Sequence, residues 1–355
     1  MESGRVAMIA SLLGWVLGGG VARAQQQPLQ LTGDNPSYLQ ATDEPPPMGD
    51  TGGAPGHEPM AAGDGAAKPA PEAAKGGETA EPEPLLWKGF LYGDPHFRDK
   101  PRPVGSPIYF EDPYINSDLR LIYVWHKFPD GGGVYGGDLS VWAAQIRLAL
   151  TERLQFTATC DGYSKLHTGI LKDDEGWNDL AVGLKYALWV DHENDFLLAS
   201  GLKWRLSNGH ANTLHGNVDE LTPYISAYKG LDKWNFIGHV AGRLPCDEDK
   251  GNYVLSWDAH VDYELFEGFF PLLEFHGVHY LSDGDRLPLK VGGLDYANIG
   301  SNDVAGNSAY WGGVGFRWNI VEHVSFGAAY EFPLRSPDKN DLFDQRVTTN
   351  VIITF

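Results

Sequence analysis

The chain has 355 residues and a net charge of −20, with only two cysteines, Cys160 and Cys246. This charge argues against nucleic acid and anionic lipid headgroups as primary partners, because the acidic chain would repel both. Two cysteines cannot form a disulfide framework, and a chain this long does not need one. A disulfide between them is possible, but nothing in their spacing supports it.

Residues 1–24 predict a cleaved signal peptide. Arg5 precedes an apolar run over residues 6–21, and Ala22 and Ala24 occupy the small-residue cleavage positions. The alternative is a single membrane anchor, which the short, glycine-rich apolar core disfavours. No later run approaches the roughly 18 to 20 apolar residues of a membrane-spanning helix. We therefore expect the mature chain to be exported without a helical anchor.

Residues 25–85 are rich in Pro, Ala, Gly and Glu and carry ten acidic residues against two lysines. Such a composition cannot bury enough apolar surface to offset the entropy of ordering it, so we predict a disordered periplasmic tail. Residues 86–117 mix aromatics with prolines and show no stable period. For this segment we favour a linker packed on the domain surface over a plug or periplasmic lid.

Residues 118–355 consist of runs that alternate apolar and polar residues, the pattern of two-faced strands. In "YVLSWDAHVDYEL" one face carries Ser, Asp, His, Asp and Glu, a row that is hard to place in a dry core. About twelve such runs occur: Leu119–His126, Leu139–Ala149, Leu154–Gly162, Trp177–Leu188, Phe196–Leu206, Leu221–Tyr228, Trp234–Arg243, Tyr253–Leu265, Leu272–Tyr280, Tyr310–Asn319, Val324–Phe332 and Phe343–Phe355.

The connections between these runs alternate between short turns and longer polar loops, among them "YSKLHTGILKDDEG". This asymmetry is typical of a transmembrane barrel and has no purpose in a soluble sandwich. The sequence therefore predicts an all-β, antiparallel, up-and-down transmembrane barrel of about twelve strands. We expect apolar residues outside, polar residues inside, and both barrel termini on the short-turn side. The aromatics Trp189, Trp234, Phe269, Phe270, Trp318 and Phe332 are expected to form interfacial girdles.

The final strand, with Val351, Ile353 and the terminal Phe355, resembles the assembly signal of bacterial outer-membrane barrels. The alternative is an ordinary edge strand. The resemblance implies the outer membrane of a Gram-negative-type cell. It also implies outer-membrane lipid, lipopolysaccharide and the barrel assembly machinery as partners. Because no strand edge can be left unpaired in lipid, this strand should pair with the first strand near Leu121.

The stretch "EGWNDLAVGLKYALW" followed by "DFLLASGLKWRLSNG" resembles the outer-membrane channel family of the meta-pathway of phenol degradation. The matching residues are Gly176, Asp179, Leu180, Gly183, Leu184, Lys185 and Tyr186. This resemblance implies passage of small, often aromatic or hydrophobic compounds. The acidic tail departs from the family pattern and leaves a role facing peptidoglycan or a partner open.

Enzymatic and metal sites find little support. Outer-membrane lipid hydrolases carry His two residues before their Ser-Asn pair, whereas here Arg205 precedes Ser207 and cannot accept a proton. On a strand, His276 and His279 fall on opposite faces and cannot share a metal. Acidic loop residues match no calcium-loop spacing. We therefore expect no enzyme, metal or cofactor, and keep a lipid hydrolase only as the least favoured alternative.

The inward face carries the functional hypothesis. It combines two sets of charged residues: Arg147, Lys185, Lys203, Arg205, Arg243, Arg317 and Arg346, and Asp258, Asp262, Glu264, Glu274 and Glu331. Opposite charges across a lumen create a transverse field that can select solutes. Internal salt bridges that close a non-conducting structural barrel are the alternative. Twelve strands lie between eight, which fill with side chains, and sixteen, which leave an aqueous pore. We favour a selective channel for small solutes.

Overall fold

A computed structural model of the chain describes residues 89–131, 133–334 and 342–355. Within these ranges the strands are β1 (Asp118–Lys127), β2 (Gly137–Ala149), β3 (Leu154–Thr168), β4 (Asp174–Trp177), β5 (Leu180–Asp191), β6 (Phe196–Leu206), β7 (Glu220–Leu231), β8 (Trp234–Pro245), β9 (Val254–Tyr263), β10 (Phe269–Tyr280), β11 (Ser308–Val321), β12 (Val324–Pro333) and β13 (Gln345–Thr354). The 3-10 helices are η2 (Pro95–Phe97) and η3 (Ala211–Thr213). The predicted signal peptide and acidic tail lie outside the described residues.

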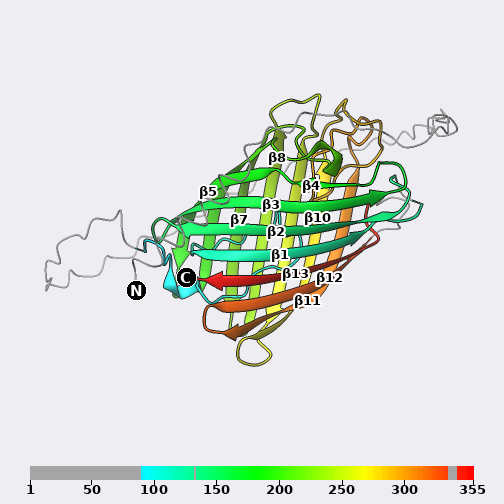
Figure 1. The fold of residues 1–355 in the computed structure, drawn as a ribbon. Coiled ribbons are helices and arrows are strands. Elements are labelled where there is room, and N and C mark those ends of the chain that lie inside the picture. The colour runs from blue at the N-terminus through cyan, green and yellow to red at the C-terminus, as the bar shows by residue number, and fades with distance from the viewer. Residues whose placement is uncertain (1–88, 132, 335–341) are drawn as a thin grey trace, which may run out of the picture. The chain divides into compact units, whose positions relative to one another are not determined.

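All strand pairs in the described part of the chain are antiparallel, and β13 lies between β1 and β12 (Figure 1). Pairing of β1 with both β2 and β13 closes a twelve-stranded barrel, and the short β4 extends the edge beside β3. Leu121 is opposite Val351, as expected for the closing strands. The predicted antiparallel barrel is thereby confirmed.

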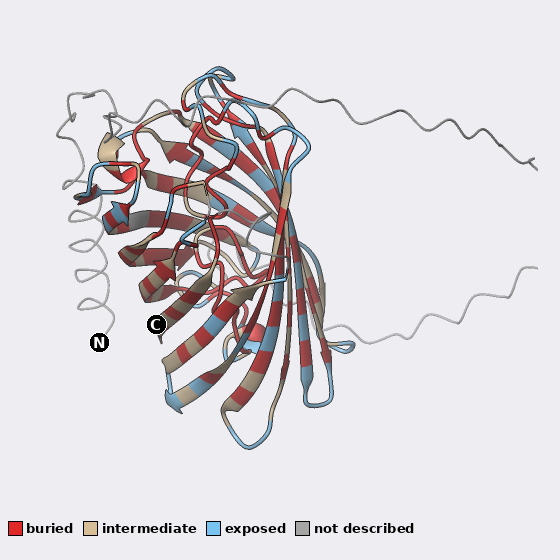
Figure 2. Ribbon diagram, turned by 90° about the vertical axis from the view of Figure 1, so that its right-hand side faces the viewer, coloured by how far each residue is buried: buried red, intermediate tan, exposed pale blue. Residues whose placement is uncertain are grey.

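Burial alternates along the strands with period two (Figure 2). In β6, for example, Leu202 and Trp204 are exposed on the outside, whereas Lys203 and Arg205 between them are buried. An apolar exterior over a polar interior is the arrangement of a barrel whose outer wall faces lipid. Among the residues that the structure describes, no helix is long and apolar enough to cross a membrane.

The alternation of connection lengths is confirmed. Short connections span residues 150–153, 192–195, 232–233, 264–268 and 322–323, whereas long ones span 128–136, 207–219, 246–253 and 281–307. One predicted loop is shorter than expected, because residues 163–168 continue β3 and 174–177 form β4. Their polar residues alternate with Leu166 and other buried positions, so the segment also has two faces.

One expected girdle residue lies elsewhere. Trp189, Trp234 and Trp318 are exposed near the short turns, but Phe270 is buried. Phe269 and Phe270 are adjacent in β10, and adjacent strand residues point to opposite faces. Only one of them can therefore face outward.

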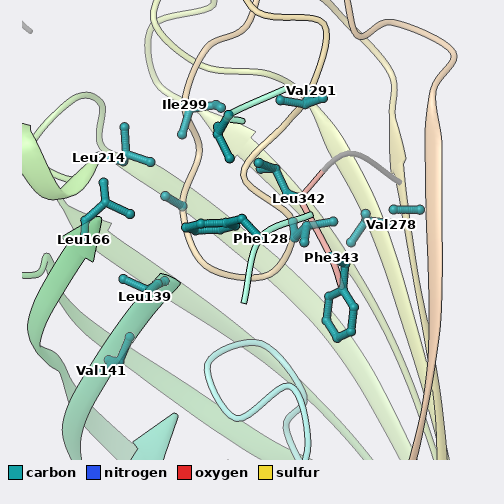
Figure 3. Packing of buried hydrophobic residues seen from close by; sticks show 14 of the residues in the cluster. Phe128, Leu139, Val141, Leu166, Leu214, Val278, Val291, Ile299, Leu342 and Phe343 are labelled. Carbon is teal, nitrogen blue, oxygen red and sulfur yellow. The ribbon is translucent and has the colours of Figure 1, made fainter. Parts of the chain in front are cut away.

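An apolar cluster fills the barrel at its long-connection end (Figure 3). Phe128, Leu139 and Phe343 lie at the ends of β1, β2 and β13, and Val291 and Ile299 come from connection 281–307. Burying a side chain of this size contributes about 1.5–3 kcal/mol. The cluster thus holds connection 281–307 over the barrel interior.

The expectation of a surface linker for residues 86–117 is wrong for residues 94–117, whereas Phe90 and Tyr92 just before them are exposed. Residues 94–117, which we call the plug, lie inside the barrel, where Phe97, Val104, Phe110 and Tyr114 are almost fully buried. The plug contacts inward side chains of β1, β2, β5, β6, β7, β10 and β11. The reason is physical: the polar inner wall needs partners, and a segment without regular structure offers its backbone groups as well as its side chains.

Candidate functional site in the barrel lumen

The structure buries all but one of the charged residues proposed for the lumen. The buried residues are Arg147, Lys185, Lys203, Arg205, Arg243, Asp258, Asp262, Glu274, Arg317, Glu331 and Arg346. Glu264 is the exception, because it lies in the turn after β9 and is half-buried at the short-turn end. The sequence analysis missed the buried charges Arg120 and Glu220, and it kept the plug only as the less favoured alternative.

The plug enters and leaves the barrel at the short-turn end. At its start, the Asp94 N–H donates to Ile115 O at 3.0 Å, and the Asp94 side chain caps η2 by accepting from His96 N. At its end, Ser117 adjoins β1, and the Phe355 N–H donates to Ser117 O at 3.0 Å. The plug is therefore a loop with both ends on one side of the barrel.

The tip of the plug binds carboxylates of β10 and of connection 281–307. The backbone N–H groups of Val104 and Gly105 donate to the two oxygens of Glu274 at 2.8 and 2.7 Å. The Ser106 hydroxyl donates to Asp295 at 2.8 Å. Ser106 has φ 47°, a left-handed conformation that lets the chain reverse at this point. Burial alone would raise the pKa of Asp295, but Arg346 and the Ser106 hydroxyl lower it to about 2.

The middle of the plug supplies two carboxylates to wall cations. Glu111 accepts from Arg147 Nη2 at 3.0 Å and from Lys203 Nζ at 3.2 Å. Asp112 lies 3.4 Å from Lys185 Nζ, whose ammonium also donates to the Asp112 carbonyl at 2.8 Å. Burial alone would raise the pKa of Glu111, but these cations hold it well below its ordinary value. Both plug carboxyl groups are therefore ionised.

Two further wall arginines bind plug backbone. Arg120 Nη2 donates to Pro103 O at 2.9 Å. Arg317 donates to Arg102 O and, at 3.0 Å, to Pro103 O. Arg102 itself pairs with Asp118 at the start of β1, at 2.7 Å. The plug backbone thus satisfies cations for which the wall has no carboxylate.

Aromatic contacts fix the plug near the short turns. The rings of Phe97 and Tyr114 both contact the Tyr228 ring edge-to-face, with centroid distances of 5.8 and 5.4 Å. Phe110 contacts the imidazoles of His239 and His276. Such pairs add about 0.5–1.5 kcal/mol each beyond area burial.

On the opposite wall, carboxylates of β9 and β10 pair with histidines of β8, β9 and β10. Asp258 bridges His239 and His276 at 2.9 and 2.7 Å. His260 bridges Asp262 and Glu274 at 2.7 and 2.8 Å. The sequence analysis placed His260 in the inward polar row but gave it no role, because only Asp262 is on the same strand and Glu274 comes from β10.

Three wall charges close further pairs. Arg346 reaches Glu331 at 2.5 Å and Asp295 at 2.7 Å. Arg205 and Arg243 share Glu220, each at 3.2 Å. The internal salt bridges that the sequence analysis kept as the alternative are therefore present, together with the plug.

Little open space remains in the lumen. The gap beside Tyr109, Arg243, Asp258 and Trp311 is too small to admit water. A cavity of about 520 Å3 lies between plug and wall at the short-turn end. Both signs of charge line it, including Arg98, Arg317 and Glu264.

The residues considered for a lipid hydrolase or a metal site form no catalytic or metal-binding arrangement within the described part of the chain. The Ser207 hydroxyl donates to Asp219 at 2.7 Å, and Arg205 is buried as predicted. His276 is fully buried, whereas His279 lies on the outer face with Trp257, so the expected opposite orientation is confirmed. Within the described ranges, no group of three or more His, Cys, Asp or Glu side chains is placed to hold a metal. Cys246 is exposed and its thiol is free.

Comparisons with known proteins found similarity only at the level of structure. No protein-family model matches the chain, and no curated protein matches it. The resemblance to the phenol-pathway channels therefore stays an expectation. The NanC porin has a TM-score of 0.42 at 12% identity, covering 67% of this chain and 98% of that one. The "KdgM porin in complex with disordered oligogalacturonate" has a TM-score of 0.39 at 9% identity, covering 66% of this chain and 99% of that one. LpxR from Salmonella typhimurium has a TM-score of 0.42 at 12% identity, covering 67% of this chain and 100% of that one.

Proposed function

We propose that the protein is a gated outer-membrane channel for small solutes, closed in this structure by its own plug. The observation that carries the proposal is that both ends of the plug lie at the short-turn end. The plug can withdraw from that end without passing through the wall and without breaking the chain.

The wall does not depend on the plug for closure. The β1 and β13 strands pair over residues 118–127 and 345–354, and no plug residue belongs to a strand of the barrel. Withdrawal would therefore leave a closed ring of strands around a polar interior, which is the architecture of a conducting barrel.

A non-conducting structural barrel is the second candidate, and one observation favours it. The lumen is filled by ion pairs and aromatic contacts that would all have to break before solute passes. In that case the plug and the acidic tail would serve as a tether in the envelope.

Conductance of the full-length protein in planar bilayers tests both candidates. Phe110→Ala removes a fully buried plug anchor, and we expect it to increase channel opening over wild type. The control Phe236→Ala removes the same ring from an exposed outer position of β8. No conductance in any of the three proteins, with normal heat-modifiable migration on gels, would reject the channel and favour the structural barrel.

Location and partners complete the proposal. The apolar outer wall supports an outer-membrane location in a Gram-negative-type cell, with the plug entrance and tail in the periplasm. Val351, Ile353 and Phe355, which are half-buried at the end of the chain, would carry the signal for the barrel assembly machinery. Lipopolysaccharide would contact the outer wall. The resemblance noted above suggests small aromatic or hydrophobic solutes.

A further inference from the structure

We propose that Arg147, Lys185 and Lys203 form a binding site for small di- and tricarboxylates, which Glu111 and Asp112 of the plug occupy in the closed state. This inference rests on the proposed channel function. It names small carboxylates as the solute class, in place of the aromatic or hydrophobic compounds that the resemblance suggests. In the open state a free carboxylate would take the place of the plug carboxylates.

The three cations converge from different strands on one short stretch of plug. Arg147 is on β2, Lys185 on β5 and Lys203 on β6, and each is at least nine-tenths buried. Their contacts with Glu111 and Asp112 join two carboxylates on adjacent residues to three cations. Two nearby carboxylates on a short flexible backbone are the chemistry of a dicarboxylic acid.

The wall itself offers these cations little compensation. Among the described residues, Lys185 has polar contacts only with Asp112, and Lys203 only with Ile108 O and Glu111, so these partners are all plug atoms. Arg147 keeps two wall partners, the Asp118 carboxylate at 3.6 Å and the Gln145 side-chain oxygen, to which it donates at 3.2 Å.

Other buried wall charges behave differently. Arg243 and Arg346 have carboxylate partners on neighbouring strands, and Asp258 is flanked by two histidines. Withdrawal of the plug would leave those pairs intact. It would uncover positive charge at the cation site, where the plug supplies carboxylates, and at Arg120 and Arg317, where it supplies only backbone carbonyls. Buried cations without partners are costly. An anion is therefore the solute that the open lumen would stabilise.

Arg147 also has unused hydrogen-bonding capacity. Its Nε and Nη1 donate no hydrogen bond within the described part of the chain. A small carboxylate, less constrained than a side chain on the plug backbone, can approach a guanidinium through two parallel hydrogen bonds. Because the site and the plug compete, a carboxylate that binds only the uncovered site shifts the equilibrium towards the open state.

Bilayer recordings of the full-length protein test this at constant ionic strength. We expect succinate, added to both sides, to raise the open fraction of wild type to a plateau. We expect 1,4-butanediol, the uncharged analogue, to have no effect. In Phe110→Ala, whose plug is loosened, the reversal potential in a KCl gradient should shift towards the chloride equilibrium potential.

Lys203→Gln separates binding from gating. It should raise opening without succinate, because the plug loses a partner. It should also raise, about tenfold or more, the succinate concentration that doubles the open-to-closed ratio over its succinate-free value, the loss expected for one hydrogen bond to a charged group. The control Lys165→Gln changes an exposed lysine paired with Glu175 and should alter neither value.

The outcomes distinguish the two proposals. If Phe110→Ala conducts but prefers cations, or wild type ignores succinate, the carboxylate site is refuted and the channel stands. If no protein conducts under any condition, both the channel and the carboxylate site are refuted. If Lys203→Gln and the control Lys165→Gln give the same open fraction and the same response to succinate, Lys203 is not part of a carboxylate site.

Discussion

The plug fits closely against the wall at Gly105, so we expect Gly105→Val to open the channel. An added Cβ at this position would stand 2.6 Å from Glu274 Oε2 and 2.9 Å from Glu331 Oε1. Neither carboxylate can easily move, because Glu274 is bound by His260 and Glu331 by Arg346. The plug tip must therefore withdraw.

Withdrawal of the tip removes the two backbone N–H bonds to Glu274. Hydrogen bonds to charged groups contribute about 1.5–3 kcal/mol each, so docking should weaken by about 3–6 kcal/mol. A loss of about 3 kcal/mol corresponds to a roughly hundredfold larger ratio of open to closed states. The barrel should still assemble, because its strand pairs do not involve Gly105.

Single-channel recording measures the open fraction, and heat-modifiable gel migration confirms the fold. The matched control is Gly238→Val, because a Cβ there meets nothing within 4 Å on the outer face of β8. If Gly105→Val assembles normally and opens no more often than Gly238→Val, the plug tip is not what holds the channel closed.

Three further predictions address the charge network and the orientation. The pKa of Glu111 is lowered in the docked plug, so its stabilising effect is complete above its ordinary pKa of about 4.3 and is lost only below it. We expect a constant open fraction from about pH 8 to about pH 5, and a rise within that range would contradict this assignment. Arg346→Gln leaves buried carboxylates unpaired and should lower the free energy of unfolding, measured by urea titration, by about 3–5 kcal/mol. The control Lys127→Gln breaks an exposed ion pair and should lower it by at most about 1 kcal/mol. Cys246 should react with a membrane-impermeant maleimide on intact cells, whereas labelling only after lysis would reverse the proposed orientation.

The sequence by itself was enough to predict the barrel wall. Period-two alternation fixes which face of each strand is polar, because adjacent residues point to opposite sides. Arg205 and Asp258 could thus be placed inside, and Leu121 opposite the last strand, without knowledge of the register. Alternating connection lengths then fixed the up-and-down order.

What fills the barrel was decided only by the tertiary structure. Residues 94–117 have no period, so their sequence carries no signal for the surface they cover. Glu111 lies 36 positions from Arg147 and 92 from Lys203, and nothing local links these residues. Charge pairing across such distances depends on which strands the closed barrel brings face to face. The lumen contents therefore follow from three-dimensional proximity, whereas the wall follows from local alternation.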